Sequence, residues 1–240
     1  MKGLFLIVDG IDGSGKGTAI DGIKEYYEKQ GKKVFDLREY WKEVNEIPEA
    51  EKLKEYDVII SSEPTHAEIG NIIRTEIVRT NHRTYSALST AQAFALDREI
   101  LHKKLIIPAL KEGKIILQER GVMTSLVYQP IQSERLTLQE ILHLPGNKVA
   151  LENAPDLLII TKIKPEAVIG RLNHRTKKDV AIFENLFFQR KIAERYESEW
   201  LKKLFENHGS TVIYLDTNQP KTPEDTKQDA IKVWEEFISR

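Results

Sequence analysis

The stretch VDGIDGSGKGTA, residues 8–19, holds four glycines and one lysine directly after an apolar run. Gly10, Gly15 and Lys16 have the spacing of a Walker A loop. Backbone N–H groups of such a loop, together with the N-terminus of the next helix, can surround a polyphosphate. The stretch therefore predicts a phosphate-binding turn between a buried strand and a helix. The residues expected to contact ATP are Gly10, Gly13, Ser14, Gly15, Lys16, Gly17 and Thr18.

A dinucleotide-binding loop is the alternative interpretation of these glycines. Asp36 ends the next predicted strand, where a ribose-binding acid would sit. However, Thr18 stands where that motif needs its third glycine or alanine, and a lysine within the turn favours a triphosphate.

The position after the lysine departs from the usual loop. A Ser or Thr there normally binds Mg²⁺, but this chain has Gly17 and places Thr18 one residue later. A second candidate ligand follows the apolar run in GKIILQERG, residues 113–121, where Glu119 could hold Mg²⁺ or its water shell. Thr18 and Glu119 are therefore the predicted metal ligands, and Arg120 is expected to point into the same cleft.

The composition limits the class of protein. In 240 residues, 36 basic and 37 acidic side chains leave a net charge of −1, which argues against binding nucleic acid or membrane through the whole surface. The absence of cysteine excludes disulfides and thiolate sites and fits a cytoplasmic protein. The apolar run Leu4–Val8 is too short for a signal peptide or a membrane span.

Apolar runs alternate with helical patterns along the chain, which predicts an α/β domain over residues 1–240 with a mainly parallel sheet between helices. Sites in such sheets lie beyond the carboxyl ends of the strands, where residues 9–18, 62–65 and 118–120 carry polar groups. The expected strands are Leu4–Val8, Lys33–Leu37, Val58–Ser61, Lys114–Leu117, Leu157–Thr161 and Thr211–Leu215. The expected helices cover residues 15–30, 86–111 with a break near Pro108, 166–173, 179–207 and 223–239.

Two segments lie outside this alternation. Residues 38–57 are charged and interrupted by Pro48, as in a linker or an insertion. Residues 162–179 are basic, with Arg171 and Arg175 four apart, and in a kinase such a segment can form a lid over phosphates. A solvated helix face or a nucleic-acid patch are the alternatives, and the lack of interleaved aromatic residues weakens the second.

Two pairs of side chains could recognise a nucleoside. Phe94 and Arg98 are four residues apart, so they share one helix face and could together stack on and hydrogen-bond a base. Ser125 and Tyr128 share a face if their segment is helical. By themselves, both pairs are also compatible with ordinary packing.

Five segments occur in the order seen in the thymidylate kinase family. They are FLIVDGIDGSGKGT (5–18), SSEPTHAEIGNIIR (61–74), AFALDRE (93–99), QERGVMTSLVYQ (118–129) and FENLFFQRKIAERY (183–196). The chain thus resembles a P-loop kinase of three-layer α/β/α fold. The resemblance implies Mg²⁺-dependent transfer of the γ-phosphoryl group of ATP to dTMP, usually in a homodimer.

The resemblance also implies roles for single residues. Lys16 would bind the donor phosphates, Asp12 would lie near the reacting phosphoryl group, and Arg120 would hold the acceptor phosphate. Arg98 would contact the thymine edge. The other residues placed on the acceptor by the motifs are Glu63, Phe94, Ser125, Tyr128 and Gln129, and Arg171 and Arg175 fall in the lid.

Departures from the family pattern leave two alternatives open. Glu119-Arg120-Gly121 lacks the usual aromatic residue, Gly17 replaces a hydroxyl, and Ser62 precedes Glu-Pro where an arginine is common. A deoxyribonucleoside kinase would use Glu63 as the general base that a nucleoside hydroxyl requires. A nucleotide-binding regulator would keep the fold without turnover.

Overall fold

The computed structural model describes residues 2–79, 81–132, 136–168 and 186–240. Six parallel strands form one sheet in the order β2-β3-β4-β1-β5-β6. All six predicted strands are present, with ends displaced by up to two residues. Their bounds are β1 (Leu4–Gly10), β2 (Val34–Asp36), β3 (Val58–Ser62), β4 (Ile115–Glu119), β5 (Leu157–Lys162) and β6 (Thr211–Asp216).

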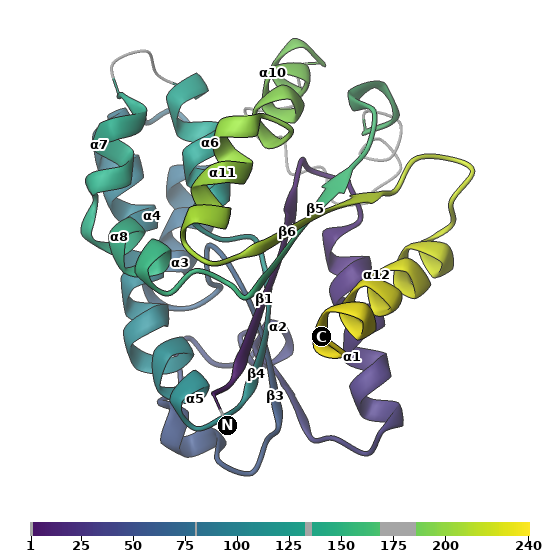
Figure 1. Cartoon of the computed structure of the whole chain (residues 1–240). Coiled ribbons are helices and arrows are strands. Elements are labelled where there is room, and N and C mark those ends of the chain that lie inside the picture. The colour runs from purple at the N-terminus through teal and green to yellow at the C-terminus, as the bar shows by residue number, and fades with distance from the viewer. Residues whose placement is uncertain (1, 80, 133–135, 169–185) are drawn as a thin grey trace.

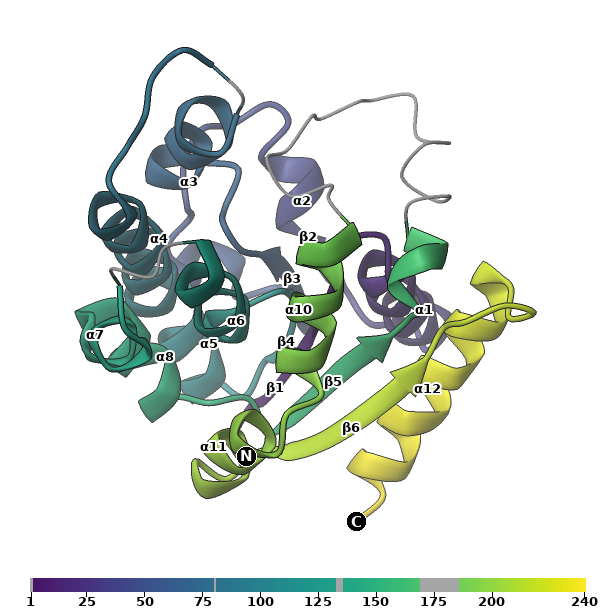
Figure 2. The ribbon, with the colours of Figure 1, turned by 90° about the horizontal axis from the view of Figure 1, so that it is seen from above.

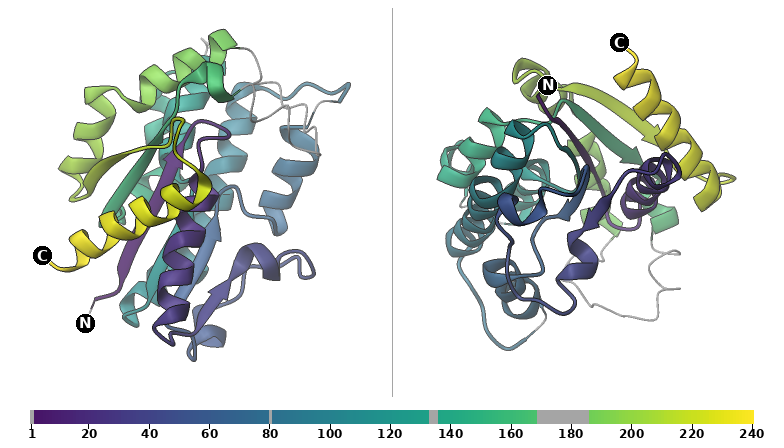
Figure 3. Two further views of the ribbon diagram at one scale, coloured as in Figure 1. Left: turned by 90° about the vertical axis from the view of Figure 1, so that its right-hand side faces the viewer. Right: turned by 90° about the horizontal axis from the view of Figure 1, so that it is seen from below.

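The central strands are apolar on both faces because helices cover both sides of the sheet. Along β1, Phe5 and Ile7 pack into one core cluster, whereas Leu6 and Val8 pack into the other. The helices α1 (Lys16–Lys29) and α12 (Pro223–Ile238) lie side by side over one face. The remaining large helices cover the other face or the carboxyl edge (Figures 1 and 3). The predicted three-layer α/β/α fold is confirmed.

The second helical layer contains helices from the middle and the later part of the chain. No helix in the described ranges is long and apolar enough to cross a membrane. The bounds of these elements are α3 (Glu68–Ile72), α4 (Ala87–Leu101), α5 (Ile107–Lys111), α6 (Val122–Gln132), α7 (Leu138–His143), α8 (Pro145–Glu152) and α11 (Glu199–Asn207). Between α3 and α5 lie two π-helical segments, η2 (Ile73–Ile77) and η3 (His102–Ile106).

Two predicted helices are interrupted. The helix over residues 86–111 passes through η3 immediately before Pro108, because proline cannot donate the next hydrogen bond and its ring crowds the preceding turn. The single helix expected over 179–207 is wrong where the structure describes it. It is divided into α10 (Leu186–Tyr196) and α11, and extended backbone at Ser198 separates the two. The expected helix over 166–173 extends into residues 169–185, outside the described part.

Residues 38–57 are not linker-like, which corrects the expectation from their charge. They contain α2 (Leu37–Tyr40) and the 3₁₀ turn η1 (Ala50–Leu53). Trp41 and Ile47 are buried in the main core cluster, and Trp41 Nε1 donates to Glu46 O at 3.0 Å. Charged residues of this segment such as Glu51 and Lys52 are exposed, whereas Ala50 and Leu53 are buried, so charge density alone gave the wrong prediction.

The carboxylate of Asp36 is taken up by protein partners, which leaves the dinucleotide-binding alternative without support. Its carboxylate accepts from Arg38 N at 3.0 Å and begins α2. It also forms ion pairs with Arg38 at 2.8 Å and Lys24 at 3.1 Å.

Candidate active site

The glycine loop connects β1 to α1 at the carboxyl edge of the sheet, beneath α10 (Figures 1 and 2). Gly10 has φ 145°, and a Cβ there would lie 2.4 Å from Thr161 Oγ1, so only glycine fits. Gly15 has φ 89° and is the N-cap of α1. The loop thus turns directly into a helix N-terminus, which is the anion-binding geometry that the sequence predicted.

Neighbouring strands hold this loop in place. Ser14 Oγ and Thr161 Oγ1 are 2.5 Å apart, and Thr217 Oγ1 donates to Ser14 O at 2.8 Å. Thr161 also donates to Asp9 O at 3.1 Å. Because all of these groups are buried, the loop is preorganised by contacts with residues at the ends of β5 and β6.

Lys16 is buried within the loop, and its Nζ donates to Ile11 O at 2.8 Å. Burial lowers the pKa of Lys16 from 10.5 to about 8, and the neighbouring charge of Arg120 lowers it as well. Lys16 and Arg120 are therefore two cations close enough to affect each other. The carboxylates that oppose the shift are those of Asp12, Glu119 and Asp9.

Glu119, at the end of β4, faces the first turn of α1. A Cβ built on Gly17 would lie 3.3 Å from Glu119 Oε2, so the missing side chain of Gly17 leaves the space beside this carboxylate open. Mg²⁺ prefers oxygen ligands and is commonly held by one or two carboxylates together with phosphate and water, and Glu119 fits that requirement. The described residues contain no ready-made cluster of three metal-binding side chains. The role of Thr18 as a second ligand stays a prediction.

Arg120 follows Glu119 and crosses the mouth of the loop. Its backbone has φ 65°, a conformation that non-glycine residues rarely adopt, and its N–H donates to Val8 O at 2.9 Å. The guanidinium forms an ion pair with Asp12 and lies 5.9 Å from the ring centroid of Tyr128. Burial alone would lower the pKa of Arg120, but the charge of Asp12, together with those of Tyr128, Tyr196 and Asp9, more than compensates and keeps that pKa well above its usual value.

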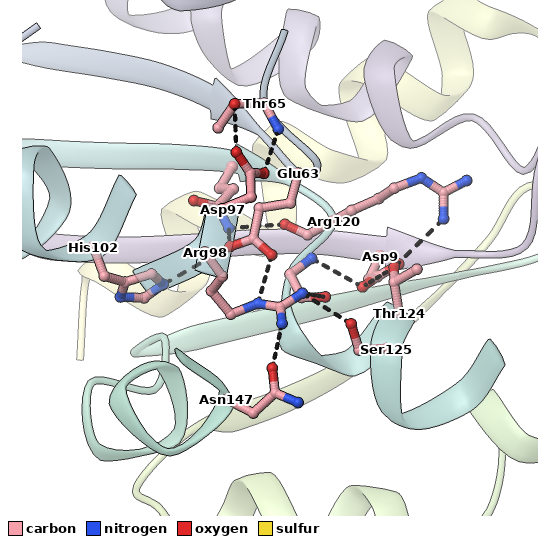
Figure 4. Close-up of polar contacts among 12 residues, drawn as sticks. Asp9, Glu63, Thr65, Asp97, Arg98, His102, Arg120, Thr124, Ser125 and Asn147 are labelled. Atoms are coloured by element: carbon pink, nitrogen blue, oxygen red, sulfur yellow. Dashed lines mark hydrogen bonds and ion pairs between the residues drawn. The ribbon is translucent and has the colours of Figure 1, made fainter. Parts of the chain in front are cut away.

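Asp9, the last charged residue of β1, is the centre of a buried hydrogen-bond network. Its Oδ1 accepts from Tyr196 Oη at 2.8 Å and from Thr124 Oγ1 at 2.9 Å, and its Oδ2 accepts from Gly121 N at 3.3 Å. Tyr196 ends α10 and Thr124 lies in α6, so one carboxylate connects three elements at the sheet edge. Figure 4 shows Asp9 beside Thr124.

Arg98, in α4, is held by a second network beside the first (Figure 4). Its Nε donates to Glu63 Oε2 at 2.7 Å and its Nη2 donates to Ser125 Oγ at 3.0 Å and Gly121 O at 3.4 Å. Its Nη1 donates to Asn147 Oδ1. Four of its five N–H groups therefore have acceptors among the described residues.

Glu63 follows β3 and completes the ion pair with Arg98. Its Oε1 accepts from Gln118 Nε2 at 3.1 Å. Burial raises the pKa of Glu63 to about 7, although the charge of Arg98 acts in the opposite direction. The backbone next to this pair is fixed by Asp97, which accepts from Thr65 N at 2.8 Å and Thr65 Oγ1 at 2.7 Å.

The remaining predicted acceptor residues lie on α4 and α6. Ser125, Tyr128 and Gln129 are all buried on α6, which confirms that their segment is helical. Gln129 Nε2 donates to Ser125 Oγ at 3.3 Å, whereas Gln129 Oε1 is buried with no hydrogen-bond partner among the described atoms. Phe94 is half-buried, one turn before Arg98.

The structure thus brings the predicted residues of the loop, β3, β4, α4 and α6 into one region. Arg171 and Arg175 lie outside the described residues, as does most of the predicted lid. Sequence reasoning gave no individual role to Asp9, Thr124, Tyr196 or Asn147. Asp9 carried a signal, since it is an acid at the end of a buried strand, and Tyr196 closes one of the five family-like segments. Asn147 carried no such signal, because it contacts Arg98 from another helix and the two residues are 49 positions apart in the sequence.

Comparison with known proteins agrees with this geometry. The family model described as thymidylate kinase matches residues 43–229, which is more than half of the chain. A thymidylate kinase of Caldicellulosiruptor saccharolyticus is 30% identical over 206 residues, covering 85% of each chain. A probable thymidylate kinase of Pyrococcus abyssi is 30% identical over 200 residues, covering 82% of each.

A solved structure resembles the whole fold. The crystal structure of thymidylate kinase from Ehrlichia chaffeensis superposes with a TM-score of 0.62 at 20% identity, over 97% of this chain and 99% of that one. At this identity the likeness concerns the fold alone, whereas the family model and the curated relatives concern the sequence. Together with the order of the motifs, they establish that the chain belongs to the thymidylate kinase family.

Proposed function

We propose that this protein transfers the γ-phosphoryl group of ATP to dTMP and forms dTDP, with Mg²⁺ as the required cation. The observation that carries the proposal is the pair of cations at the glycine loop, Lys16 and Arg120, which lie close enough for one charge to lower the pKa of the other. Two cations held together in a buried site favour a ligand that places negative charge between them.

A nucleoside monophosphate supplies that charge. Its phosphate has a second pKa of about 6, so it is largely dianionic at neutral pH and can attack without a general base. Catalysis then consists mainly of positioning and of electrostatic stabilisation of the transferred group. Lys16 would bind the donor phosphates, and Arg120, oriented by its ion pair with Asp12, would hold the acceptor phosphate.

Magnesium would neutralise charge on the donor phosphates when bound. Glu119 is the side chain that would hold it or its water shell, because its carboxylate lies beside the first turn of α1. Thr18 remains a second candidate, one residue further along the helix.

The acceptor base would lie between α4 and α6. Arg98 and Gln129 offer hydrogen-bonding groups to the base edge, Phe94 an apolar face, and Tyr128 a wall for the deoxyribose. Gln129 supports this assignment, because a buried amide oxygen without a hydrogen-bond partner in the described structure is costly unless a ligand donates to it.

The role of Glu63 as a general base, which a nucleoside kinase would need, has no support. Both of its carboxylate oxygens accept hydrogen bonds, from Arg98 and Gln118. The carboxylates that act most strongly on Lys16 are Asp12, Glu119 and Asp9. Glu63 therefore serves Arg98 in this arrangement. The intact glycine loop and its buried lysine likewise give no support to a regulator without turnover.

The proposal is tested by incubating the protein with ATP, Mg²⁺ and dTMP and identifying the product by chromatography and mass. We expect dTDP, and we expect Lys16→Ala to lower turnover by a factor on the order of 10² or more, as loss of one preorganised charge does elsewhere. The proposal would be contradicted if the protein bound ATP and dTMP but formed no more dTDP than the Lys16→Ala control.

We also propose a homodimer located in the cytoplasm. The exposed apolar side chains Ile72 of α3 and Leu88 and Leu96 of α4 support the dimer, since they lie on neighbouring helices. The complete lack of cysteine is compatible with a reducing compartment.

A further inference from the structure

The side-chain orientation of Arg98 is fixed from three directions. Glu63 approaches from the loop after β3, Ser125 from α6 and Asn147 from α8 (Figure 4). Arg98 is 1% exposed, so its guanidinium cannot rotate without losing several of these bonds. The guanidinium is planar and its five N–H groups have fixed directions. Holding four of them in place therefore also fixes the direction of the fifth.

Asn147 is the one partner of Arg98 that sequence reasoning did not find. Its side chain is fully buried, its Oδ1 accepts from Arg98 Nη1, and its Nδ2 donates to Ile141 O at 2.6 Å. The bond to Ile141, in α7, holds the amide oxygen toward Arg98. Asn147 therefore supplies a neutral acceptor, while Glu63 forms the ion pair with the guanidinium.

The helix that carries Asn147 packs against α4 with almost no space between them. A Cβ at Gly146 would lie 1.7 Å from Ala95 O, so the backbone of α8 touches the backbone of α4 one turn before Arg98. This contact sets the distance between Asn147 and Arg98 through the main chain. The relative position of Asn147 and Arg98 is therefore fixed more firmly than that of two side chains on the protein surface.

We propose that Asn147 is a positioning residue for base recognition: it orients Arg98 so that the guanidinium donates to a carbonyl group on the acceptor base. The proposal rests on the proposed function, which makes dTMP the acceptor. Arginine has donors and no acceptor, so it favours a base with a carbonyl at position 4 and disfavours one with an amino group there. Loss of Asn147 should therefore weaken the choice between these two bases.

The probe is a pair of acceptors that share the 5-methyl group and differ at position 4, dTMP and 5-methyl-dCMP. We would measure kcat/KM for each, and KM for ATP, in the wild type and in Asn147→Ala and Asn147→Leu. Asn147→Ala removes the acceptor by shortening the side chain, and Asn147→Leu removes it while keeping a side chain of similar size. Asn147→Asp keeps an acceptor for Arg98 Nη1 but loses the donor to Ile141 O. Asn153→Ala, at the C-cap of α8, is the matched control, since among the described residues that amide donates to Val149 O alone, at 2.8 Å.

In Asn147→Ala and Asn147→Leu, we expect KM for dTMP to rise on the order of tenfold, the factor that follows from losing one charged hydrogen bond. The preference for dTMP over 5-methyl-dCMP should fall by a similar factor, with KM for ATP unchanged. Asn153→Ala should stay near the wild type, and Asn147→Asp, which keeps the acceptor but loses the donor to Ile141 O, should retain more of the preference than Asn147→Ala. A purely structural role would instead lower kcat through the fraction of folded protein and leave the preference intact.

The inference is overturned if folded Asn147→Ala and Asn147→Leu keep the wild-type preference, or if Asn147→Asp loses it equally. It is also overturned if neither Asn147→Ala nor Asn147→Leu folds by circular dichroism, because Asn147 would then serve the fold and not recognition. A wild-type protein inactive on dTMP overturns the proposed function first, before any variant is compared.

Discussion

At the scale of single residues, Gly17 and Glu119 form a complementary pair. Gly17 stands at the loop position that usually carries a hydroxyl side chain. The space left by the missing side chain lies beside the Glu119 carboxylate. The metal would then depend on a side chain from β4 more than on the loop itself. Backbone in the first turn of α1 needs no unusual φ at Gly17, so the glycine is explained by its neighbour and not by its conformation.

This arrangement predicts a ranking of two substitutions. Glu119→Gln should lower Mg²⁺-dependent turnover at least tenfold more than Thr18→Ala, because it removes the charge that holds the cation. Titrating turnover against Mg²⁺ concentration measures the effect, and the Glu119 variant should need more metal for half-maximal rate. A larger loss in Thr18→Ala would show that the hydroxyl at position 18 replaces the missing one.

The lowered pKa of Lys16 predicts proton uptake when ATP binds. With a pKa of about 8, Lys16 is protonated at pH 7 but largely neutral at pH 9 in the ligand-free protein. Bound phosphates favour the charged form and raise this pKa. ATP binding should therefore take up about 0.1 proton at pH 7 and about 0.9 at pH 9, since the ligand restores the proton that burial removed.

Calorimetry in buffers of different ionisation enthalpy measures this uptake. The matched control is Lys16→Arg, whose guanidinium stays charged throughout this range, so its uptake should not change with pH. Equal, pH-independent uptake in the wild type and in Lys16→Arg would mean that Lys16 does not titrate in this range.

At the scale of elements, the strands were predictable and several helices were not. Short apolar runs such as Leu157–Thr161 belong to strands covered on both faces, and their composition alone indicates this. The helices depend on where hydrogen bonds are interrupted, as at Pro108, or on where the backbone becomes extended, as at Ser198. Residues 38–57 were mispredicted because Trp41 and Ile47 find their partners only in the folded core.

The attachment of α10 to the sheet predicts a stability loss in Tyr196→Phe. Its hydroxyl donates to the buried Asp9 carboxylate at 2.8 Å, and its removal leaves that charge with fewer donors. We expect the free energy of unfolding to fall by about 1.5–3 kcal/mol, the range for hydrogen bonds to charged groups. Urea denaturation followed by tryptophan fluorescence measures the change.

The control for this change is Tyr26→Phe, whose half-buried ring packs on Tyr27 at 5.2 Å between centroids. Its hydroxyl has no hydrogen bond within the described ranges, so we expect a loss below about 0.5 kcal/mol. Similar losses in the two variants would mean that the bond between Tyr196 and Asp9 contributes little.

At the scale of the whole molecule, the parallel sheet brings the site together. The ends of β1, β3 and β4 lie in register, with Val8 and Ser62 both opposite Glu119. Polar residues after these strands could therefore be placed at one edge from sequence alone, and Lys16, Glu63 and Arg120 were. Asn147 and Tyr196 could not, because their contacts depend on how helices pack, which strand order does not determine.

The most direct test of the account is one reaction containing equal concentrations of dTMP and thymidine, distinguishable by isotope, with ATP and Mg²⁺. The two cations at the glycine loop predict that the phosphoryl group goes to the monophosphate, so labelled dTDP should form from dTMP while thymidine remains. Conversion of thymidine to dTMP, with the added dTMP unchanged, would contradict the account.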